Sequence, residues 1–177
     1  MKTQWTIDPM HSEIEFKVKH LMISTVTGKF KSFTASAKTD GDDFDGASIQ
    51  FSADVNSLDT GNEQRDGHLQ SDDFFNAESF PKLIFASTSM SKNTHGGFDL
   101  LGDLTIRDIT KSVKLAVDFN GTMTDPYGNH KAGFELTGSI NRKDFNLKWS
   151  ATTEAGGIVV SDEVKLICNI QLAKIVA

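Results

Sequence analysis

Apolar and polar side chains alternate strictly through one early segment of this 177-residue chain. Along residues 12–20, one face carries only Glu and Lys, and the other carries Ile14, Phe16, Val18 and His20. A period of two is typical of a β-strand with one wet and one dry side. The same alternation recurs down the chain. What the chain can do therefore depends on what the dry faces enclose.

Turn signals separate the other alternating segments. They include Asp40-Gly41, Asp45-Gly46, Gly96-Gly97 and the run from Asp125 to Asn129, whose residue types favour turns. About eight or nine strands result, and residues 109–124 predict a long one. The dry faces comprise Ala47, Ile49, Phe51, Ala53 and Val55; Leu83 and Phe85; Phe98, Leu100, Gly102, Leu104 and Ile106; Val113, Leu115, Val117 and Phe119; and Phe134, Leu136, Gly138 and Ile140.

Long antiparallel strands avoid exposed edges best when their sheet closes on itself. The sequence therefore predicts an all-β fold, an antiparallel closed β-barrel of about eight strands. No internal repeat or low-complexity linker interrupts it, so residues 1–177 are expected to form a single domain.

One stretch departs from the alternation. Thr60 and Glu63 fit a capping box with Thr60 as the N-cap, and Arg65, His68 and Leu69 follow at helical spacing. We expect one short helix over about residues 62–75. It would lie near a barrel end, with Leu69 and an aromatic side chain closing that end.

The pattern leaves open whether the barrel is hollow. Ala47, Ala53, Gly102 and Gly138 lie between large neighbours on the dry faces. These small residues either leave a channel for a slender ligand or only permit the sharp strand bending that barrels need.

Composition excludes several classes of function. The net charge is −6, whereas a nucleic-acid binder normally has a basic excess. No apolar run is long enough to span a membrane. Residues 1–5 lack the apolar core of a secretory signal, so we expect a cytoplasmic protein, or a periplasmic one if a signal has been trimmed. The single cysteine, Cys168, is expected to be a small buried residue.

The five histidines suggest no metal site, because none belongs to a metal-binding motif and no cysteine pair assists. No metal or other cofactor is therefore expected. His20, on the dry face, is either a buried imidazole or a head-group ligand, and His95 and His130 lie in turns. The other two are His11 and His68.

Catalytic arrangements are equally sparse. Ser12 is adjacent to His11, but neighbouring residues on a strand face opposite ways, and the chain has no G-x-S-x-G elbow. Arg142 and Asp144 flank a turn, where they either form an ion pair or bind an anionic head group. The residues therefore favour a protein that is not an enzyme.

A set of motifs, in this order, resembles the YceI-like family of lipid-binding proteins along essentially the whole chain. They are Trp5–Ser12 with the strand to His20, Gly28–Phe30, Arg65–Leu69 with Phe74-Phe75, Pro81, Phe85, Gly102–Thr105, Arg142–Phe145 and the strand from Val164. Asn146 stands where the family often has Gly. The resemblance implies a lipocalin-like barrel that holds a polyisoprenoid or another long-chain amphiphile, without established enzymatic activity and with a possible homodimer.

The leading hypothesis is non-catalytic binding. The barrel would sequester or transport a long-chain apolar ligand, which could be a polyisoprenoid, an isoprenoid quinone or a fatty amphiphile. Head-group candidates beside His20 are His11 and Arg65. The expected ligand-binding residues are Ile14, Phe16, Val18, His20, Ile49, Phe51, Ala53, Phe85, Leu100, Leu104, Leu115, Val117, Phe134, Leu136, Leu166 and Ile170.

Two alternatives remain at this point. One is a His- or metal-assisted enzyme that acts on a lipid in the same cavity. The other is a filled barrel whose outer surface binds a protein partner.

Overall fold

The computed structural model describes residues 2–150 and 159–176. Its helical elements are α1 (Glu63–Gln70) and the 3-10 turns η1 (Pro9–His11), η2 (Val55–Ser57) and η3 (Arg142–Phe145). Its strands are β1 (Lys2–Ile7), β2 (Glu13–His20), β3 (Ser24–Phe30), β4 (Phe33–Asp40), β5 (Asp43–Asp54), β6 (Leu58–Asp59), β7 (Lys82–Lys92), β8 (Phe98–Ile106), β9 (Ile109–Thr124), β10 (His130–Asn141) and β11 (Val160–Lys174).

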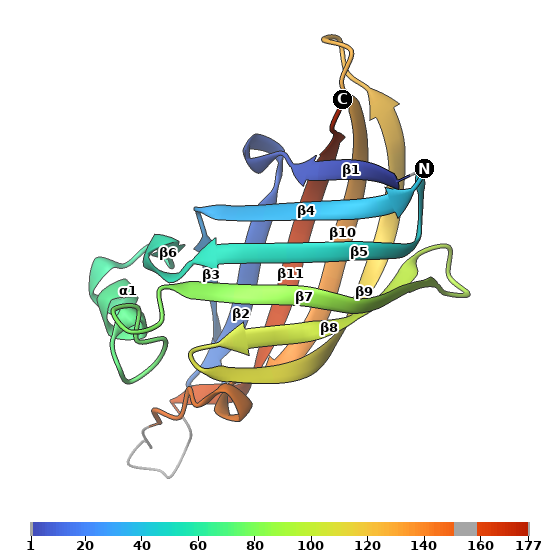
Figure 1. The fold of residues 1–177 in the computed structure, drawn as a ribbon. Coiled ribbons are helices and arrows are strands. Elements are labelled where there is room, and N and C mark those ends of the chain that lie inside the picture. Colours follow the sequence, from blue (N-terminus) through green and yellow to red (C-terminus); the bar gives the residue numbers. More distant parts are fainter. Residues whose placement is uncertain (1, 151–158, 177) are drawn as a thin grey trace.

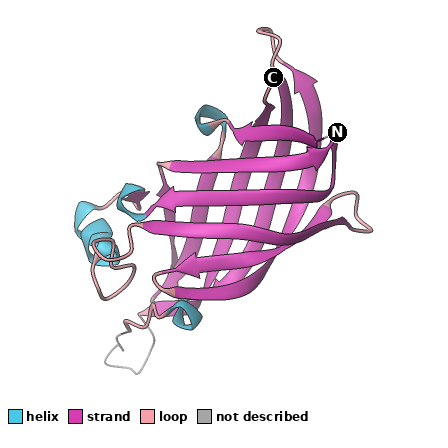
Figure 2. Ribbon diagram, viewed as in Figure 1, coloured by secondary structure: helices cyan, strands magenta, loops and turns pink. Residues whose placement is uncertain are grey.

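The described strands form one antiparallel sheet that closes on itself. Strands β1, β4, β5, β7, β8, β9, β10 and β11 are neighbours in that order, and β1 pairs with β11 to complete an eight-stranded barrel. Strands β2, β3 and β6 continue from β11. Figure 1 shows β1, β4, β5 and β7 crossing steeply over β2, β10 and β11, and Figure 2 shows how little helix accompanies them. The all-β closed barrel predicted from the sequence is confirmed.

Strands β1 and β2 share one edge of β11. Trp5 pairs with Lys174 near one end of that edge, and Phe16 pairs with Leu166 further along it. Pro9 separates the two strands at the first position of η1, and Asp8 caps this turn by accepting the backbone N–H of Met10. Because proline fixes its own φ and lacks an N–H, it ends β1 and lets the chain change direction.

One end of the barrel is packed with aromatic rings. We define the aromatic cluster as Trp5, Phe44, Phe98, Phe119 and Phe134. Ring centroids lie 5.0 Å apart for Trp5 and Phe44, 4.8 Å for Phe44 and Phe134, and 5.2 Å for Phe119 and Phe134. Such tilted and edge-to-face contacts stabilise aromatic pairs beyond simple burial, so the cluster fills this part of the interior.

A buried hydrogen bond fixes the largest ring of the cluster. The indole N–H of Trp5 donates to Thr39 Oγ1 at 2.8 Å, and the Thr39 hydroxyl donates to the carbonyl oxygen of Gly41 at 2.6 Å. Both side chains are fully enclosed. The chain thus satisfies the only polar group that this ring brings into the core.

The helix differs from the prediction in its limits and its cap. It spans Glu63–Gln70, and its N-cap is Asn62, whose side chain accepts the backbone N–H of Arg65 at 3.0 Å. Thr60, predicted as the cap, lies two residues earlier and donates its N–H and its hydroxyl to Asp66. Asparagine caps helices as well as threonine does, and it stands closer to the helix. The predicted place is confirmed, since α1 lies beside the barrel ends of β5 and β7 (Figure 1).

The dry-face glycines accommodate neighbouring side chains. A Cβ atom at Gly102 would lie 2.4 Å from Cζ of Phe85, and one at Gly138 would lie 2.5 Å from Cδ2 of Leu115. The space above each glycine is therefore occupied by a large side chain from the adjacent strand. The interpretation that these two glycines widen a channel is wrong.

We expect Thr39→Val to destabilise the fold by about 1–3 kcal/mol, because the buried indole N–H of Trp5 would lose its partner. Urea unfolding followed by tryptophan fluorescence measures the change. Thr122→Val, on an exposed part of β9, is the matched control and should change stability by less than about 0.5 kcal/mol. Equal stability of the two variants would contradict a role for the Trp5–Thr39 bond.

Candidate ligand-binding site

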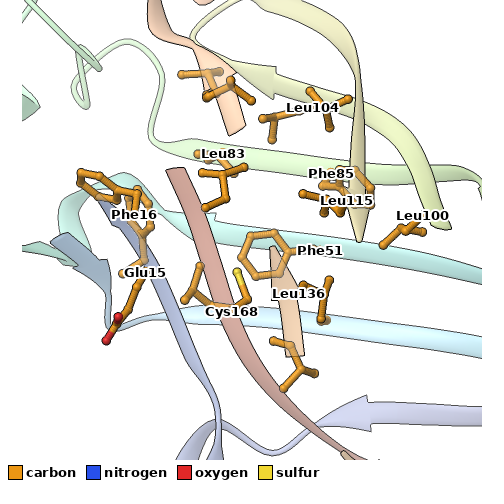
Figure 3. A pocket seen from close by; sticks show the side chains of 18 of the residues that line it. Glu15, Phe16, Phe51, Leu83, Phe85, Leu100, Leu104, Leu115, Leu136 and Cys168 are labelled. Atoms are coloured by element: carbon orange, nitrogen blue, oxygen red, sulfur yellow. The ribbon is translucent and has the colours of Figure 1, made fainter. Parts of the chain in front are cut away.

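The barrel interior contains a cavity of about 220 Å³. Its wall is drawn from both crossing layers, with residues from β2, β3, β4, β5, β7, β8, β9, β10 and β11. Figure 3 shows Phe51, Leu83, Leu136 and Cys168 pointing toward a common space, whereas the carboxylate of Glu15 points away from it. The wall is almost entirely hydrocarbon. An apolar cavity of ~150 Å³ stays dry and binds benzene, so this space is large enough for an apolar group.

The alternation in the sequence located most of this wall. All but two of the expected ligand-binding residues line the cavity. Those that line it are Ile14, Phe16, Val18, Ile49, Phe51, Phe85, Leu100, Leu104, Leu115, Val117, Phe134, Leu136, Leu166 and Ile170. Their position on the cavity wall is an observation, and their contact with a ligand remains a prediction.

The prediction for His20 was wrong in its placement. His20 is the last residue of β2 and is exposed, not on a dry face. Val18 is the last residue of β2 on the cavity wall, so the alternation of β2 continues to His20 beyond the lined interior. Ala53, the other exception, is buried but does not reach the cavity.

Several lining residues come from segments that strand alternation does not describe. Leu69, Phe74 and Phe75 follow from α1 and the turn after it, as expected for the residues that close one end. Phe44 and Leu147 were missed. Phe44 lies in a stretch rich in Asp and Gly, and Leu147 follows η3. Neither stretch has the alternating pattern that marks an inward-facing strand residue.

Arg142 is the charged side chain most deeply buried beside the cavity. Only 2% of the residue is exposed. Its guanidinium donates to the carbonyl oxygens of Leu147, Trp149 and Ser161 at 2.6–2.9 Å. Burial lowers the pKa of Arg142 from its ordinary value, and the charge of Asp162 opposes this shift.

The role of Arg142 is therefore structural. From the sequence, Arg142 and Asp144 either form an ion pair or bind an anionic head group. The structure fits an ion pair that fixes a loop, but the carboxylate that faces the guanidinium belongs to Asp162, at 3.6 Å. The hydrogen bonds hold the segment after η3 against the start of β11. That segment begins with Asn146 in the left-handed conformation, at φ 65°. Glycine and asparagine adopt this conformation most easily, which explains why Asn146 can stand where the family often has Gly.

The other head-group candidates lie outside the cavity wall. The Arg65 guanidinium donates to the hydroxyl and the carbonyl oxygen of Thr60 at 2.7 Å, which ties the start of α1 to β6. His11 is exposed on η1, and its Nδ1 lies 2.9 Å from Asp8 Oδ2. Neither side chain is placed to orient a ligand inside the barrel.

The acid–base groups considered from the sequence are separated. Ser12 bonds with the backbone of Gln171 on β11 and faces away from His11. His68 pairs with Asp73 at 2.8 Å, while Asp66 accepts from Thr60. Within residues 2–150 and 159–176, no group of three or more His, Cys, Asp or Glu is arranged to hold a metal ion. The described residues also contain no helix long and apolar enough to cross a membrane.

Asp8, the N-cap of η1, links this turn to Lys131 on β10. Its Oδ2 accepts from Lys131 Nζ at 2.9 Å, and the hydrogen bonds from Lys131 and His11 lower the pKa of Asp8 to about 2. Since the pKa is depressed in the folded state, the stability that this carboxylate contributes is present above about pH 4. It is lost as the pH falls through about 2.

We expect Asp8→Asn to lower the free energy of unfolding at neutral pH by about 1–3 kcal/mol, because charged hydrogen bonds are lost. The difference between the wild type and the variant should shrink as the pH falls from 4 toward 2. Urea unfolding at a series of pH values measures it. A difference that stays constant across this range would show that the carboxylate charge is not responsible.

Cys168 offers a probe of the cavity wall. Burial raises the pKa of its thiol to about 11, and the side chain lines the cavity. Because only the thiolate reacts with disulfide reagents, we expect labelling at pH 8 to be on the order of a hundred-fold slower than for a free cysteine. Labelling should accelerate as the pH rises and reach the ordinary rate in urea. A rate in native protein equal to that in urea would contradict the buried placement.

The geometry defines a class of protein, the closed eight-stranded antiparallel barrel with an interior that can hold one small ligand. The YceI-like domain model matches residues 5–172. The chain therefore belongs to the YceI-like family.

Known proteins agree with this assignment. The chain is 37% identical over 164 residues to a UPF0312 protein of Staphylococcus aureus strain N315, covering 92% of this chain and 93% of that one. The Campylobacter jejuni YCEI protein has a TM-score of 0.75 at 32% identity, with 88% of each chain covered. A polyisoprenoid binding domain from Saccharophagus degradans has a TM-score of 0.64 at 16% identity, covering 96% of this chain and 97% of that one, and so shows the shared fold.

Proposed function

We propose that this protein binds the hydrocarbon part of a long-chain lipid, such as a polyisoprenoid or fatty amphiphile, inside its barrel and sequesters or carries it without chemical change. The single observation that carries the proposal is the interior cavity with its wall of apolar side chains. The name of the Saccharophagus degradans domain, which has the same fold, supports the same ligand class.

The physical basis of such binding is desolvation. Each methylene moved from water into a dry cavity contributes about 0.8 kcal/mol. A tail of about ten carbons would thus gain on the order of 8 kcal/mol before the losses from ordering the ligand. No polar contact in the wall is needed for affinity, which suits a cavity whose one buried guanidinium is already bonded to backbone carbonyls.

The arrangement of polar groups supports binding without catalysis. A reaction would need a nucleophile, a base and an orienting group that converge on the bound molecule. Ser12, His11 and His68 each pair with a different partner outside the cavity wall. The cavity itself also opposes the alternative of a barrel filled with side chains, whose outer surface alone would be functional.

The direct test is native mass spectrometry of the purified protein, followed by extraction into organic solvent. We expect a co-purifying lipid, or uptake of a fluorescent fatty-acid or polyprenyl probe at one molecule per chain. If the purified protein carries no lipid and also takes up no probe, the proposal is wrong.

A pair of adjacent substitutions on β5 tests which face binds. Phe51 lines the cavity, and Gln50 is exposed. Phe51→Arg should weaken probe binding at least about tenfold, since it brings an unpaired charge into an apolar space, whereas Gln50→Arg should leave binding within about twofold. Fluorescence titration measures both.

A second variant separates loss of ligand binding from misfolding, which Phe51→Arg could also cause. Leu136→Trp adds bulk to the cavity wall without charge, so it should reduce the longest ligand accepted while circular dichroism stays unchanged. If Phe51→Arg and Gln50→Arg bind the probe equally, the ligand does not occupy this cavity.

A further inference from the structure

The turn between β2 and β3 exposes three consecutive apolar residues. Leu21 is 39% exposed, Met22 61% and Ile23 85%, and we call these three residues the apolar tip. Single exposed apolar residues are common on protein surfaces. A run of three in one hairpin turn is unfavourable in water.

The backbone of the apolar tip is also strained. Leu21 and Met22 have φ values of 54° and 60°, and the N–H of Ile23 donates to the carbonyl oxygen of His20 at 3.2 Å. His20 pairs with Ser24, so the loop has three residues, and its first two are left-handed. Asn and Gly adopt this conformation most readily. Leucine and methionine raise the energy of the folded chain there. Stability alone thus favours other residues at two positions, and strain of this kind points to a function.

The apolar tip lies close to the wall of the cavity in the sequence and in the sheet. Val18, three residues before Leu21, lines the cavity, as does Val160 at the start of β11. Val160 is the pairing partner of His20, and the N–H of Leu21 donates to the carbonyl oxygen of Val159 at 2.8 Å. The cavity wall at Val18 and Val160 thus lies within a few residues of the tip, with His20 between them.

The stem below the tip is basic. Residues 16–30 contain Lys17, Lys19 and Lys29 but no Asp or Glu, in a chain whose net charge is −6. Lys29 lies opposite Asp59 of β6, so Lys17 and Lys19 are the stem lysines. On the hairpin, Lys17 is opposite Thr27, and Lys19 donates from Nζ to Thr25 Oγ1 at 2.9 Å. Apolar residues at the tip, followed by lysines, match the layers of an anionic membrane. There the hydrocarbon part of a lysine side chain lies along the apolar boundary, and its charge meets the lipid phosphates.

We propose that the apolar tip docks the barrel onto bilayers that contain anionic phospholipids. Leu21, Met22 and Ile23 enter the boundary between head groups and acyl chains, and the stem lysines face the phosphates. This places the end of the cavity wall formed by Val18 and Val160 close to the bilayer surface from which a lipid would enter. This role rests on the proposed function, because it describes how the ligand of that function reaches the barrel.

The test is co-sedimentation of the purified protein with vesicles of phosphatidylcholine mixed with phosphatidylglycerol. The main variant is Leu21→Asn combined with Met22→Gly, which supplies residues that adopt the left-handed conformation readily. We expect at least about tenfold weaker vesicle binding together with an equal or higher melting temperature. Binding and stability would then change in opposite directions, which a structural role for the tip does not produce.

Further variants separate the contributions. Ile23→Asn lies outside the strained pair and should also weaken binding. Lys17→Gln and Lys19→Gln should each weaken it about fivefold, with little effect on vesicles of phosphatidylcholine alone. Tyr127→Ser is the control, because Tyr127 is 90% exposed on the β9–β10 turn, outside the tip, and it should bind as the wild type does.

Three results would overturn the docking role. These are no binding of the wild type to mixed vesicles, equal binding by the wild type and the Leu21→Asn, Met22→Gly variant, or a wild-type dimer that this variant converts to monomer while neither binds vesicles. The last would show that a second copy of the chain covers the tip. Uptake of a cyclodextrin-solubilised fatty probe from solution is measured separately, so that vesicle binding without uptake contradicts the proposed function and leaves the docking intact.

Discussion

The pairing of β1 with β11 is the constraint on which the rest of this structure depends. Trp5, Thr6 and Ile7 lie opposite Lys174, Ala173 and Leu172, and this short contact turns an open sheet into a closed one. Closure removes exposed strand edges from the eight barrel strands and fixes an interior whose width follows from the strand number. The cavity exists because that width exceeds what the inward side chains fill.

The interior is used unevenly along its length. At one end the aromatic cluster packs ring against ring and Trp5 is held by Thr39. Beyond it, the wall around the empty space consists of many aliphatic side chains and further phenylalanines, of which Phe16 and Phe30 contact each other at 5.9 Å between ring centroids. Aromatic rings fill volume rigidly and require few rotamers to be fixed, whereas slender aliphatic side chains leave room. The same closed sheet thus combines a solid core with a cavity.

The sequence predicted the cavity wall well because strand alternation is a local property. Phe51 and Leu136 face inward simply because they stand at alternate positions on strands with one dry side. The same rule failed at His20, because the pattern does not tell where the opposite layer of the barrel ends. It also could not place Arg142 in the interior, because the partners of Arg142 are carbonyls of residues that only the folded chain brings together. Its burial is decided by those long-range bonds, not by its neighbours in the sequence.

The two ends of the cavity differ in what must move for a ligand to enter. At the aromatic end, a path would require displacement of rings that contact one another and a broken Trp5–Thr39 bond. Elsewhere the boundary includes Leu69, Phe74 and Phe75, which follow from α1, a helix with no buried residue. Elements with few buried apolar contacts open at the lowest cost in free energy. The path of lowest cost in free energy therefore runs past α1, away from the aromatic cluster and from the segment after η3 that Arg142 holds in place.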